Sequence, residues 1–398
     1  MRAPLWILPI VLGVLLLIYP QFSNDYSTNQ NIQQALILSL LVSGLNLSLG
    51  YAGELALGQA ASYAAGAYGA AYMSMHGHTD LLLELAVGAG AALVVGIVTG
   101  IPGLRLGSWS LAMTSFFLVL LIPDVISIFS TQTGGYNGLS TNTATLFGNA
   151  LLPGGTDLYV VIGVVTLIWF AIMRNIAISR HGTALRVLKQ SPVLASSMGI
   201  SVFRMKLIAY ALGAVPAGLA GVLFANLIGY ISPTDFGFTL ATTVLAASIL
   251  GGSATVYGAL IGGFILQFGL NATASYQQYS LVVTGAFLVI GGVLLSGGLI
   301  GLARDLCSRF GIKVPESHVP RAKKAASADM PELKGSRLDV AGVAKAFGGN
   351  KALDGVDLVA EPGRVTALIG PNGSGKTTLL NMICGFYKTD AGTIRLGD

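Results

Sequence analysis

Apolar residues fill most of roughly the first 300 positions and occur in long runs separated by short polar breaks. A helix needs about 20 predominantly apolar residues to cross the hydrocarbon core of a bilayer. The runs, some of which fall short of that length, cover residues 5–19, 32–49, 50–75, 81–101, 109–129, 159–173, 207–229, 238–252, 256–272 and 281–302. The pattern predicts an all-α polytopic membrane domain over residues 1–302, with about eight to ten transmembrane helices.

Charged residues are scarce, and their positions indicate an orientation. They make up 10% of the 398 residues, whereas soluble domains carry about 25%. With ten spans both termini are cytoplasmic, and every outer loop then lacks Lys and Arg, as the positive-inside rule requires. The net charge of +5 is therefore a topology signal and does not indicate nucleic-acid binding. Glu84 and Asp124 are expected near span ends, in contact with water or headgroups.

Three further features have simple interpretations. The run 5–19 has the length of a signal peptide, but no small-x-small cleavage site follows it, so we interpret it as a retained first span. Cys307 and Cys384 imply neither a disulfide framework nor a metal site. His76 and His78 are interpreted as part of a loop.

The run 50–75 is dense in Gly and Ala and begins with a polar entry that glycine interrupts. We interpret it as a broken or re-entrant start that leads into a tightly packed helix. Interrupted hydrophobic segments often line translocation paths, and intramembrane ionisable residues are costly and frequently functional. The candidate path residues are Gly53, Glu54, Gly58 and Gln59. The alternative is a tightly packed helix with no role in transport.

One charged segment, residues 179–206, interrupts the apolar region. It contains no acidic residue, and its basic residues include Arg180, Arg186, Lys189, Arg204 and Lys206. A basic loop between hydrophobic spans belongs on the cytoplasmic side, and its middle, residues 191–198, is predicted to form a short helix on the inner membrane face. Two interpretations stay open: a helix that docks in a groove of a soluble partner, or a plain positive-inside loop.

Residues 303–335 are predicted to form a cytoplasmic linker. They include Pro315, Pro320 and Pro331 and lack hydrophobic periodicity. Such a composition does not bury enough apolar surface to fold alone. A flexible chain of this length spans roughly 30 Å, which is enough to tether a soluble domain beneath the membrane.

Residues 336–398 have the pattern of an α/β segment built around a phosphate-binding loop. Residues 338–343, 356–360 and 364–369 predict strands, and a helix is expected from residue 376. The loop between the last strand and the helix consists of Gly370, Pro371, Asn372, Gly373, Ser374, Gly375, Lys376, Thr377 and Thr378. A strand–GxxxxGK[ST]–helix arrangement predicts a nucleotide site.

The chemistry of this loop indicates ATP and Mg²⁺ as cofactors. Backbone N–H groups and the helix N-terminus hold phosphate oxygens. The Lys376 ammonium reaches the β- and γ-phosphates, and the Thr377 hydroxyl is suited to ligate the Mg²⁺ that accompanies the nucleotide.

The stretch LDVAGVAKAFGGNKALDGVDLVAEPGRVTALIGPNGSGKTTLLNMICGFYKTDAGTIRLGD resembles the start of an ABC-transporter ATPase subunit of the branched-chain amino acid type. In that family an aromatic residue upstream of the phosphate loop stacks on adenine, and the resemblance assigns this role to Phe347. The transmembrane part resembles the matching permease family over most of residues 30–300. The stretches that carry this resemblance are LNLSLGYAGELALGQAASYAAGAYGAA, GGYNGLS, SRHGTALRVLKQSPVLASSMGISVFRMKLIAYALGAVPAGLAGVLFA and LGGSATVYGALIGG.

The resemblance implies the membrane permease component of an ATP-driven ABC importer in the bacterial inner membrane. It implies that branched-chain amino acids (Leu, Ile, Val) are delivered by a periplasmic binding protein. The other implied partners are a second permease subunit, ABC ATPase subunits and membrane lipid, with no nucleic acid. The coupling helix that docks on the ATPase is implied to comprise Ala195, Ser196, Ser197, Met198, Gly199, Ile200, Ser201 and Val202.

The sequence departs from the ATPase pattern in one respect. It reaches Asp398 without a Q-loop glutamine, an LSGGQ-like signature, an acidic strand or a switch histidine. Phosphate contacts without these groups position a nucleotide but hydrolyse it poorly. We therefore expect little or no ATPase activity from these 398 residues, which represent either part of a longer permease–ATPase fusion or a protein with a vestigial second domain.

Three other functions stay open at this point. An importer of the same family for urea, short amides or other amino acids has the same spans, because the separate binding protein largely sets selectivity. A secondary transporter is disfavoured by the few intramembrane charges and by the basic loop. A nucleotide-sensing membrane scaffold would bind nucleotide without transporting any substrate.

Overall fold

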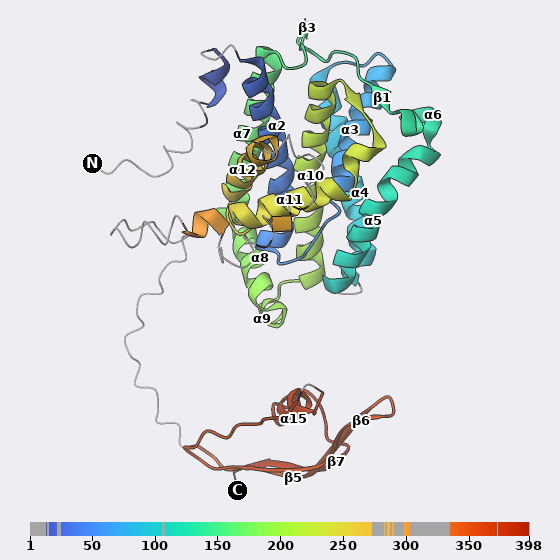
Figure 1. The fold of residues 1–398 in the computed structure, drawn as a ribbon. Helices are drawn as coiled ribbons and strands as arrows, with labels where there is room; N and C mark the ends of the chain where they lie inside the picture. Colours follow the sequence, from blue (N-terminus) through green and yellow to red (C-terminus); the bar gives the residue numbers. More distant parts are fainter. Residues whose placement is uncertain are drawn as a thin grey trace, which may run out of the picture. The chain divides into compact units, whose positions relative to one another are not determined.

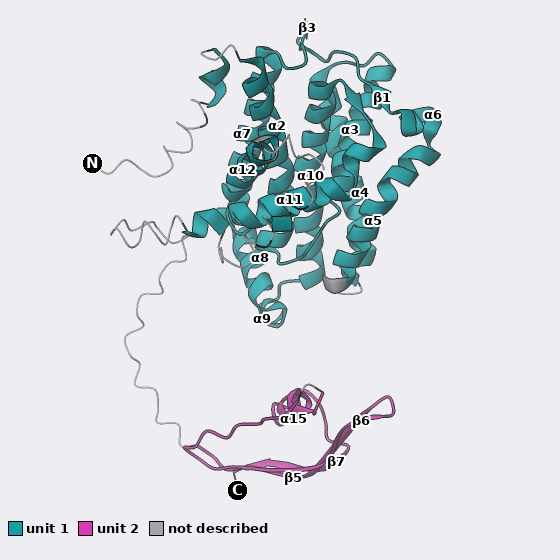
Figure 2. Cartoon of the chain, viewed as in Figure 1, with its two compact units in different colours: residues 1–316 teal, residues 317–398 magenta. Residues whose placement is uncertain are grey.

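A computed structural model of the chain divides into two compact units, residues 1–316 and 317–398 (Figures 1 and 2). The structure describes residues 13, 16–21, 25–105, 108–272, 282, 285–286, 289, 298–302, 335–371 and 373–397. Most of the apolar runs 5–19 and 281–302 and most of the linker 303–335 lie outside the described residues. The domain boundaries after residues 302 and 335 therefore stay predictions.

Unit 1 is a helical bundle, and its helices follow the apolar runs closely. Short strands occur only in the loops among its described residues. The elements are η1 (Tyr19–Gln21), α2 (Tyr26–Leu45), η2 (Asn46–Tyr51), α3 (Gln59–Met75), α4 (Leu81–Arg105), α5 (Ser108–Ile128), α6 (Ser130–Thr133), η3 (Gly135–Asn137), β1 (Leu139–Ser140), β2 (Thr145–Leu146), β3 (Asn149–Ala150), α7 (Thr156–Ile178), α8 (Arg180–Gln190), α9 (Pro192–Ser197), α10 (Val202–Ile228), β4 (Tyr230–Ile231), η4 (Pro233–Phe236), α11 (Phe238–Gly251) and α12 (Gly258–Ala272).

Side-chain caps fix where several of these helices begin. The Asp25 carboxylate accepts from the backbone N–H of Ser27 at 3.1 Å and starts α2. Ser191 caps α9 in the same way, and Pro192 occupies its first turn, where a missing N–H costs nothing. Gly229 ends α10 in a left-handed conformation, which glycine adopts at little cost.

Helix α10 lies at the centre of the bundle and touches α2, α3 and α4. The helix backbones approach each other closely at these contacts because glycines of neighbouring helices face one another. A Cβ atom on Gly44 of α2 would lie 2.1 Å from the carbonyl oxygen of Gly213, and one on Gly66 of α3 would lie 2.1 Å from that of Gly218. Close backbone approach of this kind is how helices associate in lipid, where the hydrophobic effect does not drive packing.

Six of the described helices are long and apolar enough to cross a membrane: Tyr26–Tyr51, Leu81–Arg105, Ser110–Ile128, Thr156–Ile178, Val202–Ile228 and Pro233–Gly251. The prediction of a multi-pass helical membrane domain is confirmed. The larger total of eight to ten also counts the shorter helices α3 and α12 and the two runs outside the described residues.

The loops at one end of unit 1 carry the short strands, and α9 projects at the other end (Figure 1). Strand β1 pairs antiparallel with β4, with Leu139 opposite Ile231. Strands β2 and β3 form a two-residue hairpin. The pairing of β1 with β4 joins the loop before α7 to the loop after α10, so these connections are fixed to one another.

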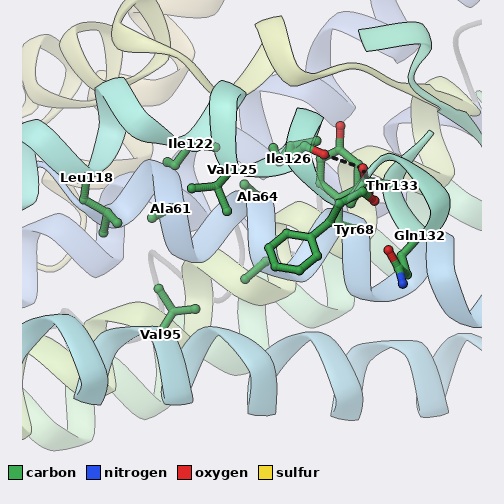
Figure 3. A pocket seen from close by; sticks show the side chains of 12 residues that line it. Ala61, Ala64, Tyr68, Val95, Leu118, Ile122, Val125, Ile126, Gln132 and Thr133 are labelled. Atoms are coloured by element: carbon green, nitrogen blue, oxygen red, sulfur yellow. Dashed lines mark hydrogen bonds between the residues drawn. The ribbon is translucent and has the colours of Figure 1, made fainter. Parts of the chain in front are cut away.

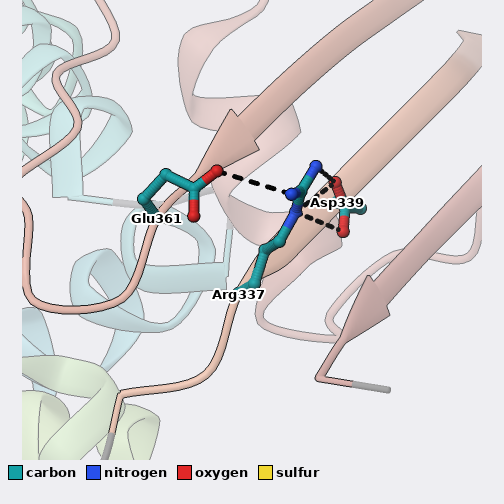
Figure 4. Close-up of polar contacts among 3 residues, drawn as sticks. All are labelled: Arg337, Asp339 and Glu361. Carbon is teal, nitrogen blue, oxygen red and sulfur yellow. Dashed lines mark hydrogen bonds and ion pairs between the residues drawn. The ribbon is translucent and has the colours of Figure 1, made fainter.

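The described part of unit 2 contains a three-stranded antiparallel sheet and one helix. Strands β5 (Leu338–Phe347), β6 (Asn350–Ala360) and β7 (Ala391–Leu396) lie in the order β6-β5-β7. Helix α15 (Lys376–Ile383) buries Leu379 and Met382 in a small core with strand residues. Where the central strand β5 begins, the exposed Arg337 guanidinium bonds the Asp339 carboxylate at 3.0 Å and lies 3.5 Å from Glu361 (Figure 4). Exposed pairs of this kind contribute little to stability.

The predicted strand at residues 364–369 is wrong in this structure. Residues 365–370 have no strand pairing, and Val365 and Ile369 are 101% and 91% exposed. A β-branched segment forms a strand only where a neighbour supplies the hydrogen-bonding partners. Within the described part of unit 2, the three paired strands belong to a separate antiparallel sheet and leave this segment unpaired.

Candidate functional site

The predicted break in the run 50–75 is confirmed. Helix α2 passes into one π-helical turn, η2, and residues 53–56 are not helical before α3 begins at Gln59. π-Helical turns occur frequently at functional sites. Gly53 has a φ of +77°, a value that other residues adopt only with strain. We call residues 50–58 the broken segment.

Two lysines from the charged segment, residues 179–206, contact the broken segment. The Lys206 ammonium forms an ion pair with the Glu54 carboxylate, and the two side chains are only 12% and 5% exposed. The Lys189 ammonium donates to the carbonyl oxygen of Gly50 at 2.8 Å. A Cβ atom on Gly53 would lie 2.9 Å from the Lys189 side chain. Residues 179–206 and the broken segment are therefore in direct contact within unit 1.

The other two candidate path residues lie where the broken segment enters α3. A Cβ atom on Gly58 would lie 2.6 Å from the Tyr210 hydroxyl, so this position requires a residue without a side chain. Gln59 is 2% exposed, and its amide atoms make no hydrogen bond among the described residues. All four candidates thus lie within or directly after the broken segment, and their role as a translocation path stays a prediction.

The predicted helix within the basic loop is present as α9. The eight residues assigned to the coupling helix span the end of α9, the turn at Met198–Gly199 and the first residue of α10. Ala195 is buried, whereas Ser196, Ser197, Met198, Gly199 and Ser201 are exposed. Val193 and Leu194, which sequence reasoning did not single out, are 71% and 51% exposed. Helix α9 therefore presents an apolar surface to the outside of unit 1.

The environment of Glu84 differs from the expected contact with water or headgroups. Although Glu84 lies in the first turn of α4, it is 1% exposed, and its carboxylate accepts from the Asn226 side chain of α10 at 2.7 Å. Asp124 is exposed near the end of α5, as expected. Burial of Glu84 follows from the close contact of α4 with α10. Asn226 is a polar residue within an apolar run, and this signal pointed to an interhelical partner.

The phosphate-binding loop of unit 2 precedes α15. The Lys376 ammonium donates to the carbonyl oxygens of Gly370 at 2.8 Å and Pro371 at 2.6 Å. Gly375 precedes the helix with a φ of +83°. A cavity of about 250 Å³ adjoins this loop. Asn372 lies outside the described residues.

The residues present fit a nucleotide with its metal. Thr377 and Thr378 occupy the first turn of α15, and the Thr377 side chain is exposed, so its hydroxyl is accessible to a Mg²⁺ ion held by phosphates. Phe347 ends β5, contacts the Tyr387 ring edge-on at 5.2 Å and lies 5.7 Å from the Lys345 ammonium. Its ring is 43% exposed, which leaves surface for the predicted adenine contact.

Unit 1 also contains two sizeable cavities. The first, of about 400 Å³, lies between α3, α4 and α5, and its walls are apolar except for Tyr68, Gln132 and Thr133 (Figure 3). The second, of about 350 Å³, is lined by α2, α3, α10, η4, α11 and α12 and combines apolar walls with amide, hydroxyl and carboxylate groups.

A bundle of apolar helices with a basic loop on its broken segment, followed by a phosphate-binding loop, defines a membrane transport protein that carries part of a nucleotide-binding domain. Residues 28–291 match the family described as "Branched-chain amino acid transport system / permease component". The chain belongs to this permease family and is a multi-pass protein of the bacterial inner membrane. Residues 353–398 match the family described as "ABC transporter".

Relatives of the two parts agree with this assignment. The permease LivM of Escherichia coli is 27% identical over 292 residues, which cover 68% of this chain and 69% of LivM. The permease LivH of the same species is 33% identical over 149 residues, which cover 37% of this chain and 48% of LivH. The Fe(3+) ions import ATP-binding protein FbpC 3 of Rhodococcus jostii is 59% identical over 59 residues, which cover 15% of this chain and 17% of that protein.

Proposed function

We propose that this permease component serves ATP-driven import of Leu, Ile and Val, delivered to its outer face by a periplasmic binding protein. The observation that carries the proposal is the contact of Lys189 and Lys206 with the broken segment. A second permease chain completes the pore, ATPase subunits dock on α9, and both termini are cytoplasmic.

The coupling step follows from the contacts in unit 1. Val193, Leu194 and Met198 give α9 an exposed apolar surface, which suits a groove on an ATPase subunit. Helix α9 lies between α8, which carries Lys189, and α10, which carries Lys206. A displacement of α9 on nucleotide binding therefore moves both lysines and, through them, the broken segment. Such discrete shifts of packed helices are how alternating states are exchanged.

The phosphate-binding loop of unit 2 binds ATP in this proposal, with Mg²⁺ at Thr377. Residues 336–398 contain the loop but no signature motif, acidic strand or switch histidine. We assign nucleotide positioning to these residues, and hydrolysis requires the remaining ATPase groups.

A transport assay on the purified complex tests the coupling step. In the double variant Glu54→Gln/Lys206→Met both charges are absent, so no unpaired charge stays buried and the bundle is expected to remain folded. We expect at least a tenfold fall in leucine transported per ATP hydrolysed. Arg204→Gln is the matched control, since Arg204 is exposed in the same turn of α10.

Wild-type leucine transport per ATP in the double variant would contradict the coupling role. Ion-gradient uptake of leucine without ATP would instead support a secondary transporter. Uptake of urea or short amides, but not of leucine, would keep the ATP-driven mechanism and replace the substrate.

A further inference from the structure

The second cavity of unit 1 combines the groups that an amino acid requires. It lies beside η4, which directly follows β4 at the end of the bundle opposite α9 (Figure 1). In the orientation that the basic loop predicts, this is the outer end, where substrate arrives. We propose that the cavity is a binding site for a zwitterionic amino acid with a branched aliphatic side chain, an inference that rests on the proposed import function.

The size of the cavity fits a small ligand. Its volume of about 350 Å³ lies at the lower end of the roughly 300–1,000 Å³ found for small-molecule sites. Helices α2, α3, α10, α11 and α12 all contribute to its lining. A site enclosed by many helices changes shape when the helices move, as a transport step requires.

Asp235 supplies a fixed negative charge for the α-ammonium group. Its Oδ2 atom accepts from the Ser232 backbone N–H at 2.8 Å and from the Ser232 hydroxyl at 3.0 Å, and these bonds orient the carboxylate. The Oδ1 atom makes no hydrogen bond among the described residues. Asp235 and Thr234 are exposed, so an incoming ammonium reaches the carboxylate directly.

Amide and hydroxyl groups on the opposite helices suit the substrate carboxylate. The Gln267 side-chain nitrogen donates to the Gln34 oxygen at 2.5 Å, and both amide side chains line the cavity. The Thr239 hydroxyl of α11 adds a donor to the same lining, whereas the Thr243 hydroxyl donates to the carbonyl oxygen of Thr239 at 2.8 Å. Neutral donors of this kind bind a carboxylate without a buried cation, and hydrogen bonds in a low-dielectric site are stronger than in water.

The apolar wall suits an aliphatic side chain. Ile37 and Leu41 lie one turn apart on α2, and Leu38 and Leu240 extend the wall. The rings of Tyr63 and Phe224, with centroids 5.5 Å apart, close the cavity on another side. The 400 Å³ cavity between α3, α4 and α5 provides the contrast, because it has no charged lining residue and therefore offers no opposite charge to an ammonium group.

Protection of an introduced cysteine tests the site in the full chain. Thr239→Cys is made in a background in which Cys307 and Cys384 are Ser, and its reaction rate with a small methanethiosulfonate is measured in lipid nanodiscs. We expect L-leucine to slow the reaction at least fivefold. The analogues 4-methyl-2-oxopentanoate, which lacks the ammonium, and 3-methylbutylamine, which lacks the carboxylate, are expected to protect at least tenfold more weakly.

Two further variants sharpen this test. Asp235→Asn is expected to raise the leucine concentration for half-protection at least tenfold, whereas Asp124→Asn, on an exposed acid away from this lining, leaves it unchanged. Leu240→Ala is expected to weaken protection by leucine more than protection by glycine.

The proposal is overturned if leucine, up to its solubility limit, leaves the reaction rate unchanged, or if Asp235→Asn and Asp124→Asn behave alike. ATP-dependent leucine uptake by the complex is measured separately. If leucine is taken up but does not protect the cysteine, the proposed binding site is wrong and the proposed import function stands. If leucine protects the cysteine but is not taken up, the proposed binding site stands and the proposed import function is wrong.

Discussion

The two units of this chain use glycine in different ways. In the bundle, helical glycines such as Gly66 face the backbone of another helix at distances that exclude a Cβ atom. In unit 2 the glycines of the phosphate-binding loop, such as Gly373 at +86° and Gly375 at +83°, have positive φ angles instead. Between the helices of the bundle glycine therefore gives close approach, whereas in the phosphate-binding loop, as at Gly53 in unit 1, it supplies a backbone conformation.

The two units also differ in how far their polar pairs are buried. The pairs Glu54–Lys206 and Glu84–Asn226 are nearly or fully buried between helices. The pairs Arg337–Asp339 and Lys351–Asp354 in unit 2 lie on the surface. Because an unpaired polar group is far more costly in an apolar interior than in water, the partners in the bundle are obligatory and those in unit 2 are not.

The largest effect is expected at Gly66. In Gly66→Ala the new Cβ atom meets the carbonyl oxygen of Gly218 at 2.1 Å, and backbone does not yield as a side chain does. We expect destabilisation of about 3 kcal/mol, at the upper end of the range for overpacking, measured by thermal unfolding in detergent. Gly90→Ala on α4 is the control, because its Cβ atom meets nothing within 4 Å. Equal melting of the two variants would show that close approach does not stabilise the bundle.

A smaller loss is expected from Asn226→Ala. The substitution leaves the buried Glu84 carboxylate without the donor at 2.7 Å, at a cost of about 2 kcal/mol. The exposed Asn175 of α7 provides the control variant Asn175→Ala. A double-mutant cycle with Glu84→Gln measures the pair directly, and additive effects would show that the two side chains do not interact.

In unit 2, Gly375→Ala tests conformation instead of packing between helices. Its φ of +83° is strained for alanine, at a cost of about 1–2 kcal/mol, and the new Cβ atom would also lie 2.5 Å from the carbonyl oxygen of Ala352. The loop is expected to shift to relieve this strain, and we expect the shifted loop to bind ATP roughly tenfold more weakly. Calorimetric titration of the full chain with ATP measures the change, and bundle unfolding is expected to stay unchanged. The exposed Lys351 gives the control Lys351→Ala. Unaltered ATP affinity in Gly375→Ala would mean that the loop tolerates a side chain here.

The sequence predicted the bundle well because apolar length and glycine content are local properties. The run 238–252 became α11 (Phe238–Gly251), and the polar, glycine-broken entry before Gln59 became an actual break. The phosphate-binding loop was visible because its spacing is also local. These features need no knowledge of which helices touch.

The errors arose where the outcome depends on distant residues. Burial of Glu84 depends on Asn226, which lies on another helix. Residues 364–369 have strand-forming composition, but a strand also needs a neighbour, and the sheet of unit 2 is formed by β5, β6 and β7. Likewise, Lys206 was recognised as a loop charge, whereas its partner Glu54 follows only from the packing of α10 against the broken segment.

The smallest effect is expected from pH on unit 2, where the carboxylates of the polar pairs are exposed. The Lys345 ammonium, which donates to the Asp390 carboxylate at 2.6 Å, lowers the pKa of Asp390 from 3.8, and a bond from the Ala346 backbone N–H acts in the same direction. A carboxyl whose pKa is lower in the folded state stabilises it above the unfolded pKa, and this contribution is lost as pH falls toward the folded pKa. Hydrogen exchange of the β5 and β7 peptides in the full chain should therefore lose protection below about pH 4. Asp390→Asn should remove that dependence, while Asp354→Asn, which changes only an exposed pair with Lys351, should retain it. If Asp390→Asn keeps the wild-type pH profile, the exposed pairs of unit 2 contribute nothing measurable, and the difference between the units is sharper than the contacts indicate.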